Sequence, residues 1–414
     1  MKLPREKNIY WPSLVKTFIL TPKSLAWGFI SKLDQKWSKY WWYQQLKDLQ
    51  NVFWLFLITR FAIFLITYYG LTMFKPGAGV FPDNLWLEGF TRWDGEHYVN
   101  LALNGYFTGG TPWFPVYPFL IRIFSYLFGD PYFAGIIVSN LSFLAALIYL
   151  YKLVKLKYGE ESSWRTILYL AVFPTTFFFC SVLSESTFLM LSVMAFYYAE
   201  KGKWCWSGFC GFLCVLTRSM GILITLPLLL IYLARKKFDL KQIKIDILPL
   251  LLIPLGVLVF MAILIYSKQN PLSFIGAQKA WGRFFAFPWW DLLRAFNELV
   301  SYNLSMFLAG EYPVSLLVNF SLTVIFIVLS LLSFKYVDLN YGLYAFLMLI
   351  FPLSNPSSKF MLYSNLRFIL VIFPVFILLG KWGKNKIIDS IIMVFSLLFL
   401  SLFSIWNGLG GWVS

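Results

Sequence analysis

Long apolar stretches of the chain alternate with short segments that carry most of the charge. A helix that crosses a bilayer needs about 20 mostly apolar residues, and about eleven stretches approach that length. They show no period-two alternation, which indicates helices rather than the strands of a membrane barrel. The predicted spans are 51–74, 132–151, 164–181, 184–200, 204–217, 219–234, 246–266, 313–333, 341–353, 365–380 and 387–406. The pattern therefore predicts an all-α integral membrane protein.

One further apolar stretch, residues 113–128, does not fit a simple span. Pro115 and Pro118 interrupt its start, and Arg122 interrupts its middle. Counting it as a span would also move the lysines that follow residue 151 to the outer side, against the charge pattern. We expect an interfacial or re-entrant helix inside the first outside loop, residues 75–131.

The distribution of basic residues predicts the orientation. Of the 35 Lys and Arg residues, 24 lie on the side of the N-terminus and ten on the other side, with Arg60 inside the first span. Positive residues favour the cytoplasm, so the N-terminus is predicted to be cytoplasmic. The prediction divides the chain into a basic, aromatic interfacial segment (1–50), a transmembrane domain (51–406) with a second large outside loop (267–312), and an outside tail (407–414). A disordered basic tail is the alternative for the first segment.

Composition narrows the class of protein. Hydrophobic residues make up 59% of the chain and charged residues 13%, whereas about 25% of the residues of a soluble domain are charged. The net charge is +16, and the basic residues lie between apolar runs. This pattern indicates membrane lipids rather than nucleic acid as partners. The chain has a single histidine and no C-x-x-C pair, which argues against a multi-histidine or zinc site.

The first outside loop holds the most concentrated group of ionisable residues, R-W-D-G-E-H-Y at 92–98. Asp94 stands beside Gly95, where a backbone can approach a substrate closely, and a carboxylate can accept a hydroxyl proton. Glu96 and His97 are alternatives for that role, and His97 is equally typical of a hydrogen-bonded structural histidine. Asp94 and Glu96 also suit a divalent cation. No other cofactor is predicted, and the motif leaves base and metal ligand open.

Other outside turns carry charged and aromatic residues that we expect to converge on Asp94. A turn between two apolar helices needs no arginine for its structure, so Arg218 and Arg367 are predicted to bind an anion, as arginine matches phosphate with two parallel hydrogen bonds. Interfacial snorkelling is the alternative for each. The remaining predicted substrate-binding residues are Arg92, Glu96, His97, Glu185, Gln278, Trp281 and Arg283.

Several short motifs occur in an order that resembles one family. They are R-W-D-G-E-H-Y at 92–98, F-P-V-Y-P at 114–118, F-P at 173–174, S-E-S at 184–186, L-T-R-S-M-G at 216–221, A-Q-K-A-W-G-R at 277–283 and N-L-R-F at 365–368. The chain resembles the PIG-V family, which contains the second mannosyltransferase of GPI-anchor synthesis and prokaryotic relatives. The likeness spans most of residues 50–380.

The resemblance implies a GT-C type glycosyltransferase of a prokaryotic cell membrane, with its site on the outer face. Such enzymes are typically inverting and take a sugar, here mannose, from a polyprenyl-phosphate donor. An acidic residue of the first outside loop serves as the base, and Asp94 matches it. The acceptor stays open among a glycolipid, a glycan and a protein. The alternative class is a transporter or flippase of lipid-linked sugars, which usually places its binding groups near the bilayer midplane.

Overall fold

The computed structural model describes residues 41–74 and 84–411 of the chain. It divides the chain into two units, residues 1–53 and 54–414, and the start of helix α3 is the described part of the first. The described residues form helices joined by turns, and their only β-type pairing is the single bridge between Arg283 and Ser357. The prediction of an all-α fold is confirmed.

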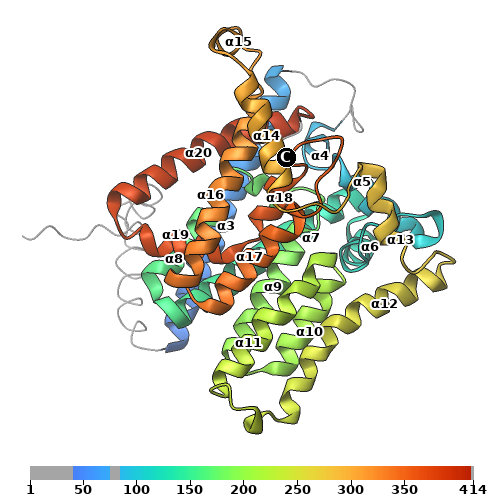
Figure 1. The fold of residues 1–414 in the computed structure, drawn as a ribbon, viewed down its shortest axis with the longest axis vertical. Helices are drawn as coiled ribbons and strands as arrows, with labels where there is room; N and C mark the ends of the chain where they lie inside the picture. The colour runs from blue at the N-terminus through green and yellow to red at the C-terminus, as the bar shows by residue number, and fades with distance from the viewer. Residues whose placement is uncertain (1–40, 75–83, 412–414) are drawn as a thin grey trace, which may run out of the picture. The chain divides into compact units, whose positions relative to one another are not determined.

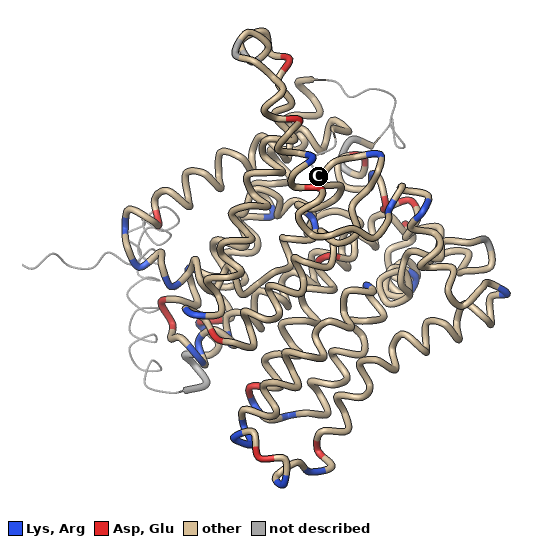
Figure 2. The backbone as a smooth tube through the Cα atoms, in the orientation of Figure 1, with Lys and Arg blue, Asp and Glu red and all other residues tan. Residues whose placement is uncertain are grey.

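Five helical segments are long and apolar enough to cross a membrane. They are Gln45–Phe74 within α3 (Trp41–Phe74), α7 (Pro131–Tyr158), Ile245–Tyr266 comprising η5 (Ile245–Leu251) and α12 (Leu252–Tyr266), α16 (Val314–Tyr336) and α20 (Lys386–Gly408). Shorter apolar helical segments are α6 (Val116–Phe128), α10 (Trp204–Val215), Ser219–Arg235 comprising η3 (Ser219–Ile224) and α11 (Thr225–Arg235), α17 (Leu339–Leu353) and α19 (Phe373–Trp382). Figure 2 shows that charged residues gather at the connections and leave long uncharged stretches. The chain is an integral membrane protein.

The remaining helices are short or carry polar residues at their first turn. They are α4 (Leu85–Glu88), α5 (Asp94–Asn104), η1 (Gly105–Thr108), α8 (Glu160–Val172), η2 (Thr176–Phe179), α9 (Glu185–Glu200), η4 (Leu240–Gln242), α13 (Ser273–Gly276), η6 (Ala277–Trp281), α14 (Trp290–Ser301), α15 (Leu304–Leu308) and α18 (Asn365–Leu370). The second large outside loop therefore contains four short helices rather than irregular chain.

Two predicted spans are interrupted, and the predicted continuous runs 164–181 and 365–380 are wrong in this respect. Helix α8 ends at Val172, and Phe173 is extended (φ −57°, ψ 146°) because a residue before proline avoids the helical region. The second run is split into α18 and α19, and Pro374 lies in the first turn of α19, where its missing N–H costs little. The apolar pattern could not reveal breaks inside uniformly apolar sequence.

Helix α6 begins at Val116, directly after Pro115, which confirms that the prolines interrupt the stretch 113–128. Its outward side chains are mostly apolar, with Phe119, Tyr126 and Leu127 strongly exposed, and they include the exposed Arg122. That surface suits contact with lipid, and the interfacial position of α6 stays a prediction. Residues 1–40 of the predicted interfacial segment, residues 75–83 of the first outside loop and residues 412–414 of the tail lie outside the described part.

Helix α9 lies at the centre of the described fold, with α7, α10 and α11 packed around it (Figure 1). Helix α7 also contacts α6 and α8, while α16, α17 and α19 pack together on the other side. Small residues permit the closest approaches: a Cβ at Gly380 of α19 would come within 2.8 Å of the Ser162 carbonyl oxygen in α8. This packing fixes both ends of α9.

Candidate active site

Four charged side chains from four separate segments meet at the N-terminal end of α9, and we call them the Glu185 cluster: Asp94, Glu185, Arg218 and Arg367. Arg367 donates to Asp94 Oδ2 through Nη1 at 2.8 Å and to Glu185 Oε1 through Nε at 2.8 Å. Arg218 Nη1 lies 2.6 Å from the same Glu185 oxygen. The predicted convergence of Asp94 with Arg218 and Arg367 is thus present in the structure.

Burial differs sharply within the Glu185 cluster. The Glu185 side chain is 0% exposed and Arg367 is 6% exposed, whereas Arg218 is 15% and Asp94 is 28% exposed. A buried carboxylate is tolerated only when it is paired, and two arginines share this one. Asp94 and Arg218 are therefore the partly exposed members of the cluster, while Glu185 and Arg367 are its buried members.

Local backbone geometry explains how the two carboxylates reach the cluster. Glu185 and Asp94 are the first residues of α9 and α5, and negative charge is favoured at a helix N-terminus. Trp93, immediately before Asp94, has φ 61°, and Ser364, just before α18 and Arg367, has φ 60°. Non-glycine residues at positive φ are strained and often mark functional sites.

Tyrosines of the two loop motifs tie this region together, and the sequence reasoning missed them. The Tyr98 hydroxyl lies 2.8 Å from Ser184 Oγ, and burial raises the pKa of that hydroxyl, which keeps it protonated. The Tyr117 hydroxyl lies 2.7 Å from Ser139 Oγ and 3.1 Å from the Gly135 carbonyl. Both tyrosines stand inside the motifs 92–98 and 114–118, which was the available signal.

Arg60, the arginine inside the first span, holds the interrupted segment that leads to Glu185. Its Nη2 donates to the Ala171 carbonyl at 3.0 Å, and its Nη1 donates to the Thr176 carbonyl at 3.3 Å. The guanidinium also lies 4.5 Å from the centre of the Phe143 ring. A cation at the carboxyl end of α8 satisfies carbonyls that the helix leaves open. Arg60 is therefore a positioning residue for the stretch 173–184.

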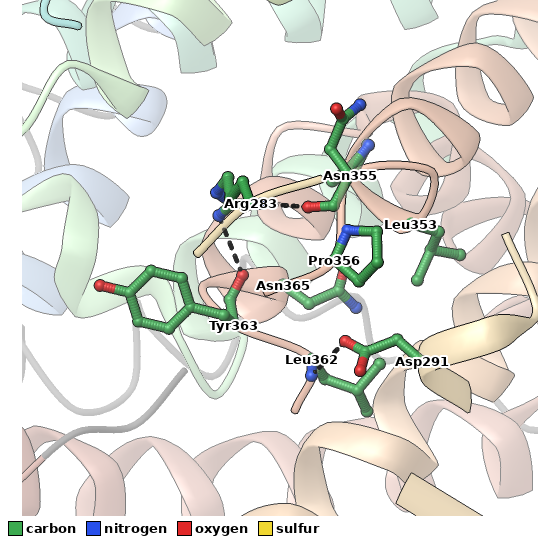
Figure 3. Close-up of a pocket in the computed structure, with 9 residues that line it drawn as sticks. Arg283, Asp291, Leu353, Asn355, Pro356, Leu362, Tyr363 and Asn365 are labelled. Atoms are coloured by element: carbon green, nitrogen blue, oxygen red, sulfur yellow. Dashed lines mark hydrogen bonds between the residues drawn. The ribbon is translucent and has the colours of Figure 1, made fainter. Parts of the chain in front are cut away.

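Arg283 joins its own loop to the segment 355–363, as Figure 3 shows. Its Nη1 donates to the Asn355 carbonyl at 2.7 Å and its Nη2 to the Tyr363 carbonyl at 3.3 Å. Burial, followed by the nearby charges of Arg367 and Arg218, lowers the pKa of Arg283 to about 10, against the opposing effect of Tyr363. Arg283 is thus close to the Glu185 cluster and remains charged at neutral pH.

Next to Arg283, the buried Asp291 side chain accepts a hydrogen bond from the Leu362 amide at 2.6 Å. Burial raises the pKa of Asp291. Arg283, Asp291 and Tyr363 line a cavity of about 10 Å³, which offers room for about one water molecule. The Phe368 ring lies between two cations, 5.3 Å from Arg218 Cζ and 5.5 Å from Arg283 Cζ. Neither Asp291 nor Phe368 was predicted from the sequence.

The other predicted substrate-binding residues lie outside the Glu185 cluster. Arg92 Nη2 pairs with Glu88 at 2.8 Å, and a Cβ at Gly410 would come within 2.7 Å of Arg92 Nη1, so this guanidinium is directed at the end of α20. Gln278 is half-buried in η6, with its carbonyl bound to the Arg283 amide. His97 and Trp281 belong to a group of rings beside α5. Their roles toward a substrate stay predictions.

Side chains that could bind a metal ion are not clustered in the part of the chain that the structure describes. No group of three or more His, Cys, Asp and Glu side chains there is arranged to hold an ion. Asp94 and Glu96 are two residues apart on α5, and side chains at that spacing do not face each other. Glu96 is exposed, whereas Asp94 is turned toward Arg367. A shared cation at these two residues stays an untested alternative.

Comparisons with known proteins give a family match and several similar structures. A family model described as dolichyl-phosphate-mannose-protein mannosyltransferase matches residues 111–266, a segment that contains Glu185 and Arg218 but neither Asp94 nor Arg367. No curated protein matches the chain. The resemblance to the PIG-V family is tested by neither result and stays a prediction.

Two of the similar structures are of ArnT from Cupriavidus metallidurans. The crystal structure bound to undecaprenyl phosphate gives a TM-score of 0.49 at 16% identity, covering 81% of this chain and 62% of that chain. The apo crystal structure gives a TM-score of 0.47 at 17% identity, covering 80% of this chain and 61% of that chain. This chain therefore spans about three fifths of the ArnT length.

Proposed function

We propose that the chain is a GT-C type, inverting glycosyltransferase of the cell membrane, with Asp94 as its catalytic residue. It moves a sugar, mannose by the PIG-V resemblance, from a polyprenyl-phosphate donor to a hydroxyl of a glycolipid or glycan. The observation that carries this proposal is the meeting of Asp94 with Arg367, Glu185 and Arg218. The match of residues 111–266 to a mannosyltransferase model supports the same class of reaction.

In the proposed reaction, Asp94 is the general base. The acceptor hydroxyl gives its proton to the Asp94 carboxylate as its oxygen forms a bond to the anomeric carbon. The bond from that carbon to the phosphate oxygen breaks on the opposite face, and the phosphate leaves with the electron pair. One displacement inverts the centre, as in single-displacement glycosidases with water replaced by a sugar hydroxyl. The hydrogen bond from Arg367 holds the Asp94 carboxylate in a fixed position for this step.

The leaving phosphate is assigned to Arg218. Arg367 directs Nε, Nη1 and Nη2 at carboxylates, and Arg283 directs both terminal nitrogens at carbonyls. The hydrogen bonds of Arg218 to described residues all run through Nη1, to Glu185 and Ser184. Its other donors suit an anion in a partly desolvated site, where developing charge is stabilised most. Arg367 and Arg283 are then positioning residues, which narrows the roles expected from the sequence.

The proposed topology follows the distribution of basic residues. The Glu185 cluster and the segments 277–286 and 354–363 belong to turns that carry few of the 35 Lys and Arg residues. We therefore assign them to the non-cytoplasmic face and the N-terminus to the cytoplasm. Polyprenyl-phosphate sugars are lipids, so a donor can approach from the bilayer without a soluble domain to bind it.

Reconstitution with a labelled donor tests the proposal. The full chain in vesicles is supplied with polyprenyl-phosphate [14C]mannose and lipid extract, and products are separated and identified by mass spectrometry. A new glycosidic product that needs Asp94 is expected. Movement of the intact donor across the vesicle without product would favour the transporter alternative. No product and no movement would exclude both, leaving a non-catalytic membrane subunit.

A further inference from the structure

Three ring side chains from three separate segments form a line beside α5, and we call them the aromatic shelf: His97, Trp113 and Trp281. The His97 and Trp113 rings are stacked, with centroids 4.0 Å apart and planes at 22°. Trp281 meets Trp113 edge-on, with centroids 5.6 Å apart. His97 is exposed and both tryptophans are half-buried, so the shelf offers ring surface to a ligand.

The aromatic shelf begins within one helical turn of the proposed base. His97 follows Asp94 by three residues in α5, and side chains at that spacing are neighbours on one face of a helix. Asp94 extends toward Arg367, and His97 extends toward Trp113. A group held on the shelf is therefore held next to the Asp94 carboxylate.

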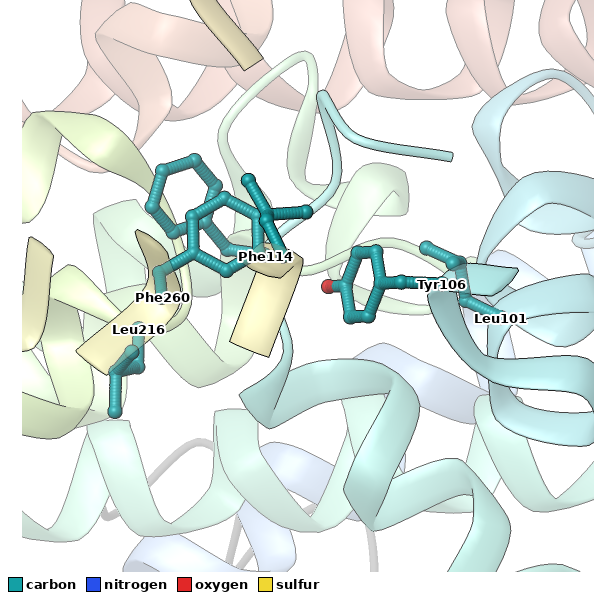
Figure 4. Packing of buried hydrophobic residues seen from close by; sticks show 6 residues of the cluster. Leu101, Tyr106, Phe114, Leu216 and Phe260 are labelled. Atoms are coloured by element: carbon teal, nitrogen blue, oxygen red, sulfur yellow. The ribbon is translucent and has the colours of Figure 1, made fainter. Parts of the chain in front are cut away.

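The tryptophans of the shelf are fixed from behind. The Tyr106 hydroxyl donates to the Trp113 carbonyl at 2.5 Å, and Ser357 Oγ donates to the Trp281 carbonyl at 2.6 Å. Trp113 also packs against a hydrophobic cluster, part of which is drawn in Figure 4, formed by Leu101, Tyr106, Phe114, Leu216, Phe260 and Leu264. Rings that are already in place cost little entropy when they bind a ligand.

We propose that the aromatic shelf is the acceptor subsite and that it takes a hexopyranose ring, which makes the acceptor a glycan or glycolipid rather than a peptide. This inference rests on the proposed function. A pyranose has an apolar C–H face that packs on aromatic rings and a rim of hydroxyls that needs polar partners. The shelf supplies both, because the exposed His97 adds its imidazole nitrogens to the tryptophan rings.

The same features disfavour the other lipid of the reaction as the occupant of the shelf. A polyprenyl chain requires a continuous apolar surface, and burying His97 against hydrocarbon would leave its polar nitrogens without partners. The phosphate end of the donor is already assigned to Arg218, on a different segment. A sugar on the shelf places one hydroxyl at Asp94 without competing for Arg218.

Binding and transfer are measured separately on the full chain in nanodiscs. Saturation-transfer NMR with methyl α-mannopyranoside and methyl α-glucopyranoside reports binding without the donor. Transfer is assayed with polyprenyl-phosphate mannose and either a mannoside or a serine-containing hexapeptide as acceptor. Trp113→Ala and Trp281→Ala are expected to weaken glycoside binding and raise the acceptor KM about 10-fold, with the donor KM unchanged. His97→Ala, at an exposed position, gives the same direction without a risk to folding.

Trp289→Ala is the matched control, because Trp289 is an exposed tryptophan of the same outside loop that stacks on Phe287. It should leave both measurements unchanged. Glycoside binding that survives all three shelf substitutions overturns the inference. Transfer to the peptide with unchanged kinetics in Trp113→Ala also overturns it, while the glycosyl transfer at Asp94 in the proposed function stands and only its acceptor changes. Shelf-dependent glycoside binding with no transfer to any acceptor supports a sugar site and counts against the proposed function.

Discussion

Helix α9 carries a glutamate at each end, and each is the centre of a charged network. At its N-terminal end, Glu185 belongs to the Glu185 cluster. At its C-terminal end, about 22 Å away by helical rise, Glu200 Oε1 is 2.5 Å from Lys157 Nζ and 3.0 Å from the Tyr341 hydroxyl. Lys157 also pairs with Asp338 at 3.0 Å. We call Lys157, Glu200, Asp338 and Tyr341 the Glu200 cluster.

The two clusters differ in burial, in charge and in backbone strain. Glu185 and Arg367 are almost fully buried, whereas Lys157 is 19% and Asp338 is 35% exposed. The Glu185 cluster balances two carboxylates with two arginines and has Arg283 nearby, while one lysine serves two carboxylates in the Glu200 cluster. Among described residues, positive φ occurs at Trp93 and Ser364 beside the first cluster, whereas beside the second it occurs at Gly159 and Gly202, where glycine adopts it without strain.

These differences indicate that the Glu185 cluster is a functional site and that the Glu200 cluster is a structural ion-pair network. Partly exposed ion pairs are cheap to form and contribute little, so the Glu200 cluster serves chiefly to join the ends of α7 and α9 to the turn between α16 and α17. Desolvating Glu185 and two arginines is expensive, and replacing such groups by apolar residues often stabilises a protein. Their presence, with strained backbone on both sides, favours a role in chemistry over a role in stability.

The largest expected effect is that of Asp94→Asn on transfer. Removing a general base lowers the rate by about 10²–10⁴-fold. The fold should persist, since Asp94 is partly exposed and the asparagine can still accept from Arg367. The measurement is product formation from labelled donor, together with thermal unfolding of the purified chain.

Asp338→Asn is the matched control for that substitution, because it neutralises a carboxylate of the Glu200 cluster. It should leave transfer within about twofold, as expected for a surface change away from the site. Equal losses in the two variants, or near-normal transfer by Asp94→Asn, would remove Asp94 from the role of base.

Next in size is the effect of Arg367→Met on stability. It leaves the buried Glu185 with one arginine and Asp94 with none, and breaking a buried pair costs about 3–5 kcal/mol. Lys157→Met removes the cation of the Glu200 cluster, where partly exposed pairs contribute about 0.2–1 kcal/mol. Denaturant unfolding in detergent compares the two. A larger loss for Lys157→Met would reverse the contrast drawn between the clusters.

A smaller effect is expected for Arg218→Ala on use of the donor. A hydrogen bond to a charged group contributes about 1.5–3 kcal/mol, so the donor KM should rise by about 10–100-fold. Arg165→Ala is the control, since Arg165 pairs with Glu161 on the surface of α8. The donor KM of each variant is measured by titrating the donor at a saturating acceptor concentration. An unchanged donor KM in Arg218→Ala would move the phosphate away from this residue.

The sequence predicted which charged residues lie close together, but not which of them pair with one another. The predicted topology placed Asp94, Glu185, Arg218 and Arg367 on the same side of the membrane. In the structure these residues are in contact. The pattern could not predict that Arg367 is saturated by carboxylates, because pairing depends on contacts between residues as far apart as 94 and 367. For the same reason Arg92, within the motif itself, pairs with Glu88 instead.

Helix bounds show a similar limit. Hydrophobic runs located the long apolar helices, because burial in lipid demands an apolar side chain at almost every position, but they did not locate short helices such as α5 and α14. They could not locate the interruption after Val172, where a proline and carbonyls held by Arg60 replace regular helix. Ser184 and Glu185 follow this interruption and lie at the candidate site. The part of the span that leads to the site was therefore the part that hydropathy predicted least well.

The smallest expected effect is that of backbone strain, tested by Ser364→Gly. Ser364 has φ 60° and makes no side-chain capping bond to α18. Glycine adopts this conformation without strain, so the free energy of unfolding should rise by about 0.5–1 kcal/mol. Lys237→Gly, at φ 53° in an exposed turn far along the chain from the cluster, should give a similar gain. Only Ser364→Gly should also slow transfer, by about threefold or more, because Arg367 loses a fixed direction toward Asp94. Equal transfer rates in the two variants would mean that strain beside the Glu185 cluster is incidental to its chemistry.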